Sequence, residues 1–289
     1  MFWSNRQRII SKALRYTYMA KPRSRWWLAD QSLTSVAGFV SQIAGDGIHE
    51  GADNNVQILK YRPGATVFRL CSCEGREQSY VVKVFRLRRL GHKLKYDGLG
   101  YNRFGLSEAA NLIIASERGL CVPTVYGYGR IRGSSSLVKM SIVVEEDLPS
   151  HVSVGRLLRF SCGDRRKTTA VLDCVIPIFS NLYQASCNHI DVNLGSILVG
   201  DEGSQRAYLL DFEHAVFHST PSLNVVMFEA AVFAQGCSKW VGEELITDWL
   251  GRLLSALRVQ GQAERMNLSR RFHYYRGVHL SRKERKRIR

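Results

Sequence analysis

The chain changes character at Glu145-Glu146, and this change limits the folds that it can adopt. Before this point, short apolar runs separated by turn signals are typical of strands, with one helical segment among them. After it, apolar residues recur at intervals of three and four, as in helices. Strands are expected at 58–61, 66–73, 79–87, 125–131, 137–144, 197–199 and 207–210, and helices at 106–117, 154–160, 166–187 and 222–258. The pattern predicts an α+β fold, in which a small five-stranded lobe with one helix precedes a mostly helical lobe.

This division gives four expected segments. Residues 1–55 form a basic N-terminal extension with a helix at 4–20, and residues 56–146 form the first lobe. Residues 147–260 form the second lobe, and 261–289 a basic C-terminal tail. No apolar run is long enough to span a membrane, and an odd number of cysteines, seven, suits a reducing compartment.

Lys83 lies in the apolar run Val81–Phe85. Such a lysine is either solvated on the outer face of an edge strand or buried as a functional cation, and a buried lysine needs an anionic partner. Glu108 lies 25 residues further on, near the start of the expected helix, whereas Glu117 is about two and a half turns later and faces the other way. We expect Glu108 to be the partner.

Two aspartates follow in the second half of the chain. Asp191 lies in the segment His189–Asn193, and Asp211 stands 20 residues later, after an apolar strand. Each could be a capping or turn residue. A lysine followed by two such carboxylates is, however, the polar set that phosphoryl transfer needs: a cation for the ATP phosphates, a base for the acceptor proton and a carboxylate for magnesium. The sequence therefore favours an ATP- and Mg²⁺-dependent phosphotransferase, with Asp191 as the base and Asp211 as the metal ligand.

The two segments 189–198 and 209–215, which read HIDVNLGSIL and LLDFEHA, resemble the catalytic block of the Kdo/WaaP lipopolysaccharide kinase family. The resemblance covers about residues 55–260 and implies a bilobal protein-kinase-like fold. It also implies that ATP and magnesium are used to phosphorylate a sugar of the lipopolysaccharide inner core. The location it implies is cytoplasmic, peripheral to the inner membrane of a Gram-negative bacterium.

The same resemblance suggests further site residues. Ser196 stands five residues after Asp191, where kinases usually place a metal-binding asparagine, and Asn193 is close by. Both are candidate magnesium ligands, together with Asp211. Gly64, in Pro63-Gly64-Ala65-Thr66, is the single glycine that stands for a glycine-rich loop over the ATP phosphates.

The formal net charge of +16 predicts a polyanionic partner. Residues 1–29 carry seven Lys/Arg and no acid, and the last 25 residues carry ten against one acid, with aromatic residues interspersed. An anionic membrane surface and a lipid-linked anionic saccharide acceptor fit this mixture, and nucleic acid is disfavoured. A solvated surface helix and a frayed tail would also explain it.

Two other function classes stay open. A catalytically weak pseudokinase, acting as a membrane-associated regulatory protein, would fit Ser196 and the lone Gly64. An atypical RIO-like protein kinase would need a peptide-binding activation segment, and only Thr220-Pro221-Ser222 follows Glu213 before the next helix. A nucleic-acid-binding protein would explain the charge but not the lysine and the two aspartates.

Overall fold

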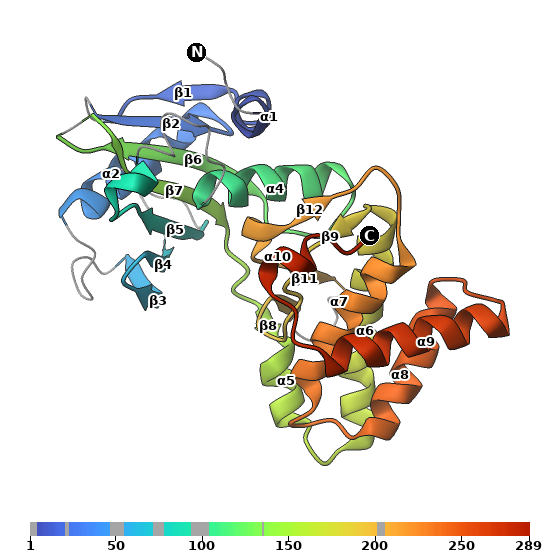
Figure 1. Cartoon of the computed structure of the whole chain (residues 1–289). Helices are drawn as coiled ribbons and strands as arrows, with labels where there is room; N and C mark the ends of the chain where they lie inside the picture. Colours follow the sequence, from blue (N-terminus) through green and yellow to red (C-terminus); the bar gives the residue numbers. More distant parts are fainter. Residues whose placement is uncertain are drawn as a thin grey trace. The chain divides into compact units, whose positions relative to one another are not determined.

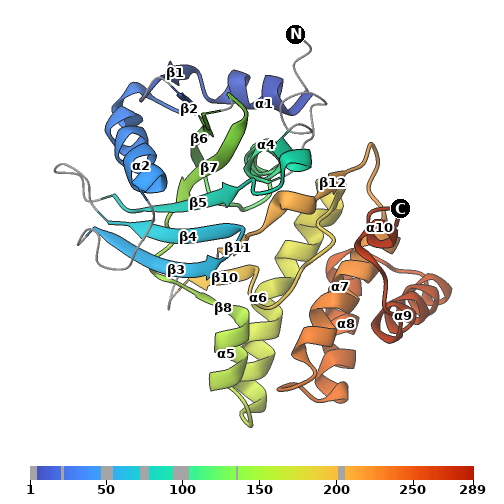
Figure 2. The same cartoon turned by 60° about the vertical axis from the view of Figure 1, so that its left-hand side comes forward.

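The computed structural model describes residues 5–20, 23–46, 55–71, 78–93, 104–134, 136–200 and 206–289. The chain has a mixed α/β fold with an antiparallel sheet and many helices (Figures 1 and 2). It divides into two compact units. The first comprises residues 1–114 and 123–148, and the second comprises residues 115–122 and 149–289.

The first unit is built on one antiparallel sheet of seven strands, in the order β1-β2-β6-β7-β5-β4-β3. The strands are β1 (Tyr16–Tyr18), β2 (Ser24–Leu28), β3 (Val56–Arg62), β4 (Ala65–Leu70), β5 (Tyr80–Arg86), β6 (Val125–Arg132) and β7 (Val138–Glu146). The five runs expected from the sequence are β3 to β7. The expected strand 66–73 ends at Leu70, and residues 72 and 73 lie outside the described residues.

The expectation of a five-stranded sheet was wrong, because the N-terminal segment joins the sheet. Helix α1 (Asn5–Ala13) is shorter than the helix expected at 4–20, and Tyr16–Tyr18 forms β1 instead. Strand β1 pairs with β2, and β2 pairs with β6, so both strands extend the sheet at one edge. Trp26 and Leu28 of β2 are buried because they belong to the core of this unit.

Helix α2 (Thr34–Asp46), preceded by the short 3₁₀ helix η1 (Gln31–Leu33), covers one face of the sheet (Figure 2). Val82 and Val84 of β5 pack in the core beneath it, and Trp26 Nε1 donates a hydrogen bond to Ser41 Oγ at 2.9 Å. Because side chains alternate along a strand, Lys83 points to the opposite face. Helix α4 (Gly105–Glu117) lies there, and a Cβ on Gly105 would lie 2.7 Å from Ser141 Oγ of β7. Glycine therefore allows α4 to begin close against the sheet.

The second unit is mostly helical. Its helices are α5 (Val154–Phe160), α6 (Arg165–Gln184), α7 (Leu223–Cys237), α8 (Glu243–Ala256), α9 (Gln262–Gly277), α10 (Arg282–Arg285) and the 3₁₀ helix η2 (Phe212–His214). Its short strands are β8 (His151–Ser153), β9 (Cys187–Asn188), β10 (Ile197–Gly200), β11 (Ala207–Leu209) and β12 (Val216–Phe217). The helix expected at 166–187 ends at Gln184, and the one expected at 222–258 is two helices, broken at residues 238–242.

Three buried aromatic rings join the helices of the second unit. Phe179 of α6, Phe233 of α7 and Trp249 of α8 have ring centroids 5.3–5.7 Å apart. The Trp249 indole N–H donates to Leu172 O of α6 at 3.0 Å, which satisfies the polar group of a fully buried ring. These contacts hold α6, α7 and α8 together and so fix the position of the segments that carry the candidate site.

Helix α9 is part of the folded second unit. Phe272 is fully buried, Tyr275 Oη donates to Asn224 Oδ1 of α7 at 3.0 Å, and the Tyr275 and Phe228 rings lie 5.5 Å apart. Residues 261–289, expected from the sequence as a basic tail, therefore contain two helices, α9 and α10. No helix in the part of the chain that the structure describes has the length and apolar character needed to cross a membrane.

Candidate active site

Lys83 in the first unit is held by two carboxylates. Its Nζ lies 2.8 Å from Glu108 Oε1 of α4 and 3.1 Å from Glu145 Oε2 of β7. Both glutamate side chains are 3% exposed, and that of the lysine is 11% exposed. An ammonium fixed by two buried anions is preorganised, with a single orientation toward any ligand that reaches it.

The partner of Lys83 is the one expected from the helical spacing. Glu108 lies in the first turn of α4 and faces the sheet, whereas Glu117, at the end of the helix, is exposed. The second partner, Glu145, was missed. In the register of the sheet Glu145 opposes Val81, two residues from Lys83, so it reaches the ammonium diagonally. The signal for it was a carboxylate that directly follows the apolar residues Ile142–Val144 of a central strand.

Gly64 lies in the two-residue turn between β3 and β4, where Arg62 pairs with Ala65. Its carbonyl accepts the Arg86 N–H at 2.9 Å. A Cβ at this position would meet no heavy atom within 4 Å, so the fold itself does not require glycine there.

In the second unit, the loop between β9 and β10 carries Asp191. His189 is fully buried, and its Nε2 lies 2.7 Å from the Leu210 carbonyl oxygen. Burial lowers the pKa of His189, so the ring is neutral and donates from Nε2 to that carbonyl. The ring also stacks edge-on against Phe212, with 4.7 Å between the centroids. These contacts tie the loop to the segment that follows β11.

Ile190 bends the same loop. Its φ of 67° is uncommon for a β-branched residue, so the surrounding structure must hold it there. Glu229 of α7, fully buried, accepts the Ile190 N–H at 2.6 Å. Burial raises the pKa of Glu229 to about 8, although the backbone N–H groups of Ile190, Val192 and His189 act to lower it. Sequence reasoning missed Glu229, whose signal was a single carboxylate within the apolar run 225–234.

Glu229 gives a prediction about stability and pH. The folded state holds a proton on Glu229 that the unfolded chain releases near its ordinary pKa of 4.5, so folding stability should fall as the pH rises from about 4.5 to about 8. Glu229→Gln keeps an acceptor for the Ile190 N–H but does not titrate. Its free energy of unfolding, measured with urea, should therefore fall less over this pH range than that of the wild type. Glu229→Ala removes the acceptor and should cost about 1–3 kcal/mol. Equal pH dependence in the wild type and Glu229→Gln would contradict the account.

Asn193 and Ser196 brace the loop from within. The Asn193 Oδ1 accepts the N–H groups of Gly195 and Ser196 at 2.9 and 3.2 Å. The Ser196 Oγ, fully buried, accepts the Asn193 N–H at 2.9 Å and donates to the Asn193 carbonyl at 2.8 Å. Magnesium binding through either side chain would therefore compete with these hydrogen bonds.

Asp191 itself is exposed, with 53% of its side chain accessible. Its Oδ1 lies 3.9 Å from Arg285 Nη1, and the same guanidinium donates to the Ile190 carbonyl at 3.3 Å. Arg285 belongs to α10, almost a hundred residues further along the chain, and no local sequence signal indicated it. A carboxylate on a braced loop, open to solvent, can accept a proton from a bound alcohol.

Asp211 is also exposed and has a left-handed backbone, with φ 63° and ψ 52°. The residue before it is bonded to the loop, because the Leu210 N–H donates to Ser196 O at 2.8 Å and the Leu210 carbonyl faces His189. The second unit therefore brings Asp191, Asn193, Ser196 and Asp211 together. Lys83, Glu108 and Gly64 belong to the first unit.

A carboxylate such as Asp211 fits magnesium, which binds hard oxygen ligands and typically needs only one or two protein carboxylates beside phosphates and water. Among the described residues, no cluster of three or more His, Cys, Asp or Glu side chains could hold a metal ion. Glu213, two residues after Asp211, lies 3.7 Å from the His214 ring through its Oε2.

Comparison with known proteins identifies the family. Residues 54–223 match the model described as "Lipopolysaccharide kinase (Kdo/WaaP) family". This span is more than half of the chain and contains Lys83, Glu108, Asp191 and Asp211. The protein is therefore a kinase by class, and it belongs to the lipopolysaccharide kinase (Kdo/WaaP) family.

The comparison with curated proteins gave no match. Among the solved structures that match, one is described as "WaaP in complex with acyl carrier protein". It shares 18% sequence identity with this chain, the match covers 76% of this chain and 88% of that one, and the TM-score is 0.45.

Proposed function

We propose that this protein transfers the γ-phosphoryl group of ATP to a sugar hydroxyl of the lipopolysaccharide inner core. The family match over residues 54–223 carries the proposal, because the matched span contains every polar group that phosphoryl transfer needs. In this reading, the first unit is the N-lobe and the second unit the C-lobe of a bilobal protein-kinase-like enzyme.

Each residue has a defined role in the proposed reaction. Lys83, held by Glu108 and Glu145, binds the α- and β-phosphates of ATP, and Gly64 lets the β3–β4 turn approach the phosphates. Asp191 takes the proton of the acceptor hydroxyl while the hydroxyl oxygen attacks the γ-phosphorus of ATP, and ADP leaves. Asp211, with Asn193 or Ser196 as further candidate ligands, would hold magnesium, which neutralises the charge that develops on the phosphates.

The experiment that tests the metal role replaces Asp211. Asp211→Asn should weaken magnesium-dependent ATP binding by at least about tenfold, since a charged hydrogen-bonding or ligand group contributes about 1.5–3 kcal/mol. ATP binding is measured by calorimetry with magnesium and with EDTA. The matched control is Asp248→Asn, an exposed carboxylate on α8, which should bind ATP as the wild type does. Unchanged magnesium dependence in Asp211→Asn would exclude Asp211 as the ligand.

We also propose that the protein works at an anionic membrane surface, because its acceptor is lipid-linked. Helix α1 and the two residues after it present Arg8, Lys12 and Arg15, all exposed. A basic residue near an anionic surface contributes about 1 kcal/mol, and salt screens the attraction.

The membrane proposal predicts selective vesicle binding. The protein should co-sediment with vesicles that contain phosphatidylglycerol but not with pure phosphatidylcholine vesicles. The triple change Arg8→Gln, Lys12→Gln and Arg15→Gln should weaken that binding by at least about tenfold. It spares the buried residues Ile10 and Leu14 of the same segment, so the fold should persist. Equal binding to both kinds of vesicle would contradict the proposal.

A further inference from the structure

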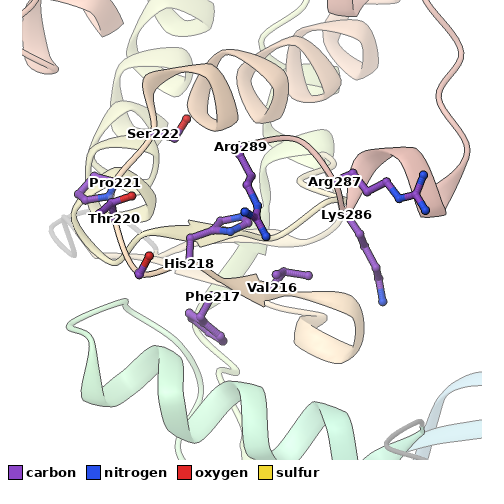
Figure 3. A pocket seen from close by; sticks show the side chains of 10 residues that line it. Val216, Phe217, His218, Thr220, Pro221, Ser222, Lys286, Arg287 and Arg289 are labelled. Carbon is purple, nitrogen blue, oxygen red and sulfur yellow. The ribbon is translucent and has the colours of Figure 1, made fainter.

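The second unit contains a cavity of about 740 Å³, and none of the residues given a role in the proposed reaction lines it (Figure 3). Residues 216–222 form one part of its lining, and Lys286, Arg287 and Arg289 form the other. Its volume lies in the range of small-molecule sites and is large enough for a saccharide of one or two rings.

The basic wall of the cavity is held in place by two side-chain amides. Asn188, fully buried, donates from Nδ2 to the carbonyl oxygens of Arg285 at 2.9 Å and Ile288 at 3.3 Å. Asn224 donates from Nδ2 to the Arg289 carbonyl at 2.8 Å. These bonds fix the backbone of residues 285–289, from which the side chains of the three lining cations extend.

The cavity adjoins the loop that carries Asp191. Strand β12, which begins the lining, pairs with β9, the strand that leads directly into His189. The His218 N–H donates to Ser186 O at 2.8 Å, just before β9. On the other side, Arg285 precedes the basic wall and lies 3.9 Å from the Asp191 carboxylate. A ligand in this cavity would therefore lie close to the loop that carries the proposed catalytic base.

The cavity is electropositive. Three of its ten lining residues are Lys or Arg, and none is acidic. Arg118 adds a fourth positive charge nearby, since it donates to the His218 carbonyl at 3.1 Å and lies 5.1 Å from the Phe217 ring centroid. Figure 3 shows the Arg289 and His218 side chains together in the cavity. Such a surface attracts anions and offers them charge-assisted hydrogen bonds.

His218 also belongs to the lining of the cavity. Burial, and then the charges of Arg289 and Arg118, lower the pKa of His218, so its ring is neutral at pH 7. Its Nε2 is buried and has no hydrogen-bond partner among the described residues. A buried polar atom without a partner is costly unless a ligand or water satisfies it. A ligand would satisfy this atom only after a neighbouring side chain moved, because the buried Nε2 has almost no exposed surface.

We infer that this cavity binds an anionic group, a phosphate or a carboxylate, on the saccharide acceptor, and that Lys286 and Arg289 determine specificity for it. The inference rests on the proposed function, because it places the acceptor close to the loop that carries Asp191. In this inference, the basic side chains of residues 286–289 recognise the acceptor.

The test titrates the full chain, with ¹³C-labelled histidine, against four probes: glucose 6-phosphate, glucuronate, glucose and inorganic phosphate. The His218 ring resonance, assigned with His218→Gln, reports binding. Glucose 6-phosphate or glucuronate should shift it at concentrations at which glucose has no effect. Lys286→Gln with Arg289→Gln should raise the Kd of the effective probe by at least about tenfold, the loss expected for charged hydrogen bonds.

The matched control is Arg282→Gln with Lys283→Gln, which removes two exposed cations from α10 outside the cavity lining. Its Kd should stay within about twofold of the wild type, because neither Arg282 nor Lys283 lines the cavity. The inference would be overturned if both double variants raised the Kd of the probe equally. It would also be overturned if glucose bound as tightly as the anionic sugars. Inorganic phosphate that binds as tightly as glucose 6-phosphate would also overturn it, because a saccharide would then not be recognised.

This binding test is independent of catalysis. If the anionic sugars bind in the cavity but no phosphoryl transfer occurs, the proposed function fails and the cavity assignment stands. If transfer depends on Asp191 but the cavity variants bind and react normally, the cavity assignment fails and the proposed function stands.

Discussion

Lys83→Ala is expected to lower kcat/KM for ATP by about 10²–10³-fold, the loss typical of removing one preorganised electrostatic contact from an active site. The same change should destabilise the first unit. It leaves Glu108 and Glu145 buried and facing each other, and removal of one partner from a buried ion pair costs about 3–5 kcal/mol. ATP turnover and urea unfolding measure the two effects separately.

Two further variants separate the role of Lys83 in folding from its role in catalysis. Lys83→Arg keeps a cation beside the two glutamates and should recover much of the stability. Phosphoryl transfer should stay impaired, because the planar guanidinium does not reproduce the geometry of the lysine ammonium. Glu117→Gln changes an exposed carboxylate on the same helix as Glu108 and should alter neither property. Normal ATP turnover in folded Lys83→Ala protein would exclude Lys83 as the phosphate-binding cation.

Asp191→Asn is expected to lower kcat by about 10²–10⁴-fold, the usual contribution of a general base. ATP affinity should be unchanged, because the carboxylate acts on the acceptor proton in the transition state and not on the nucleotide. Stability should also be unchanged to within about 0.5 kcal/mol, since more than half of the Asp191 side chain is exposed.

A second, partly exposed carboxylate serves as the control for Asp191. Asp173→Asn changes a surface residue of α6 whose carboxylate contacts Arg252, and kcat should remain normal. If Asp191→Asn weakens ATP binding as much as it slows transfer, Asp191 acts in nucleotide binding, and its assignment as the base is wrong.

Much of the fold and of the site could be predicted because the signals were local. The helical spacing distinguished Glu108 from Glu117, and the structure places Glu108 against Lys83. The apolar runs gave β3 to β7 because alternation and turn residues are properties of short segments. The spacing of Asp191 and Asp211 indicated that they belong together, and the second unit joins them through Leu210.

The missed features depend on contacts between distant parts of the chain. The aromatic residues within 1–29 were attributed to a membrane surface, but one of them, Trp26, is buried under α2. Its strand, β2, pairs with β6, a hundred residues later. Glu229 and Arg285 reach the loop around Asp191 from 38 and 94 residues away along the chain. Such contacts depend on tertiary packing, which neither periodicity nor motif spacing encodes.

The central claim is tested most directly by phosphoryl transfer to purified lipopolysaccharide. The acceptor is lipopolysaccharide that lacks inner-core phosphate. It is incubated with the protein, γ-labelled ATP and magnesium, and the core sugars are then released and the position of the label is found by mass analysis. We predict label on an inner-core sugar with the wild type, none without magnesium, and almost none with Asp191→Asn. No transfer by folded wild-type protein, or equal transfer by Asp191→Asn, would contradict the account and favour a pseudokinase.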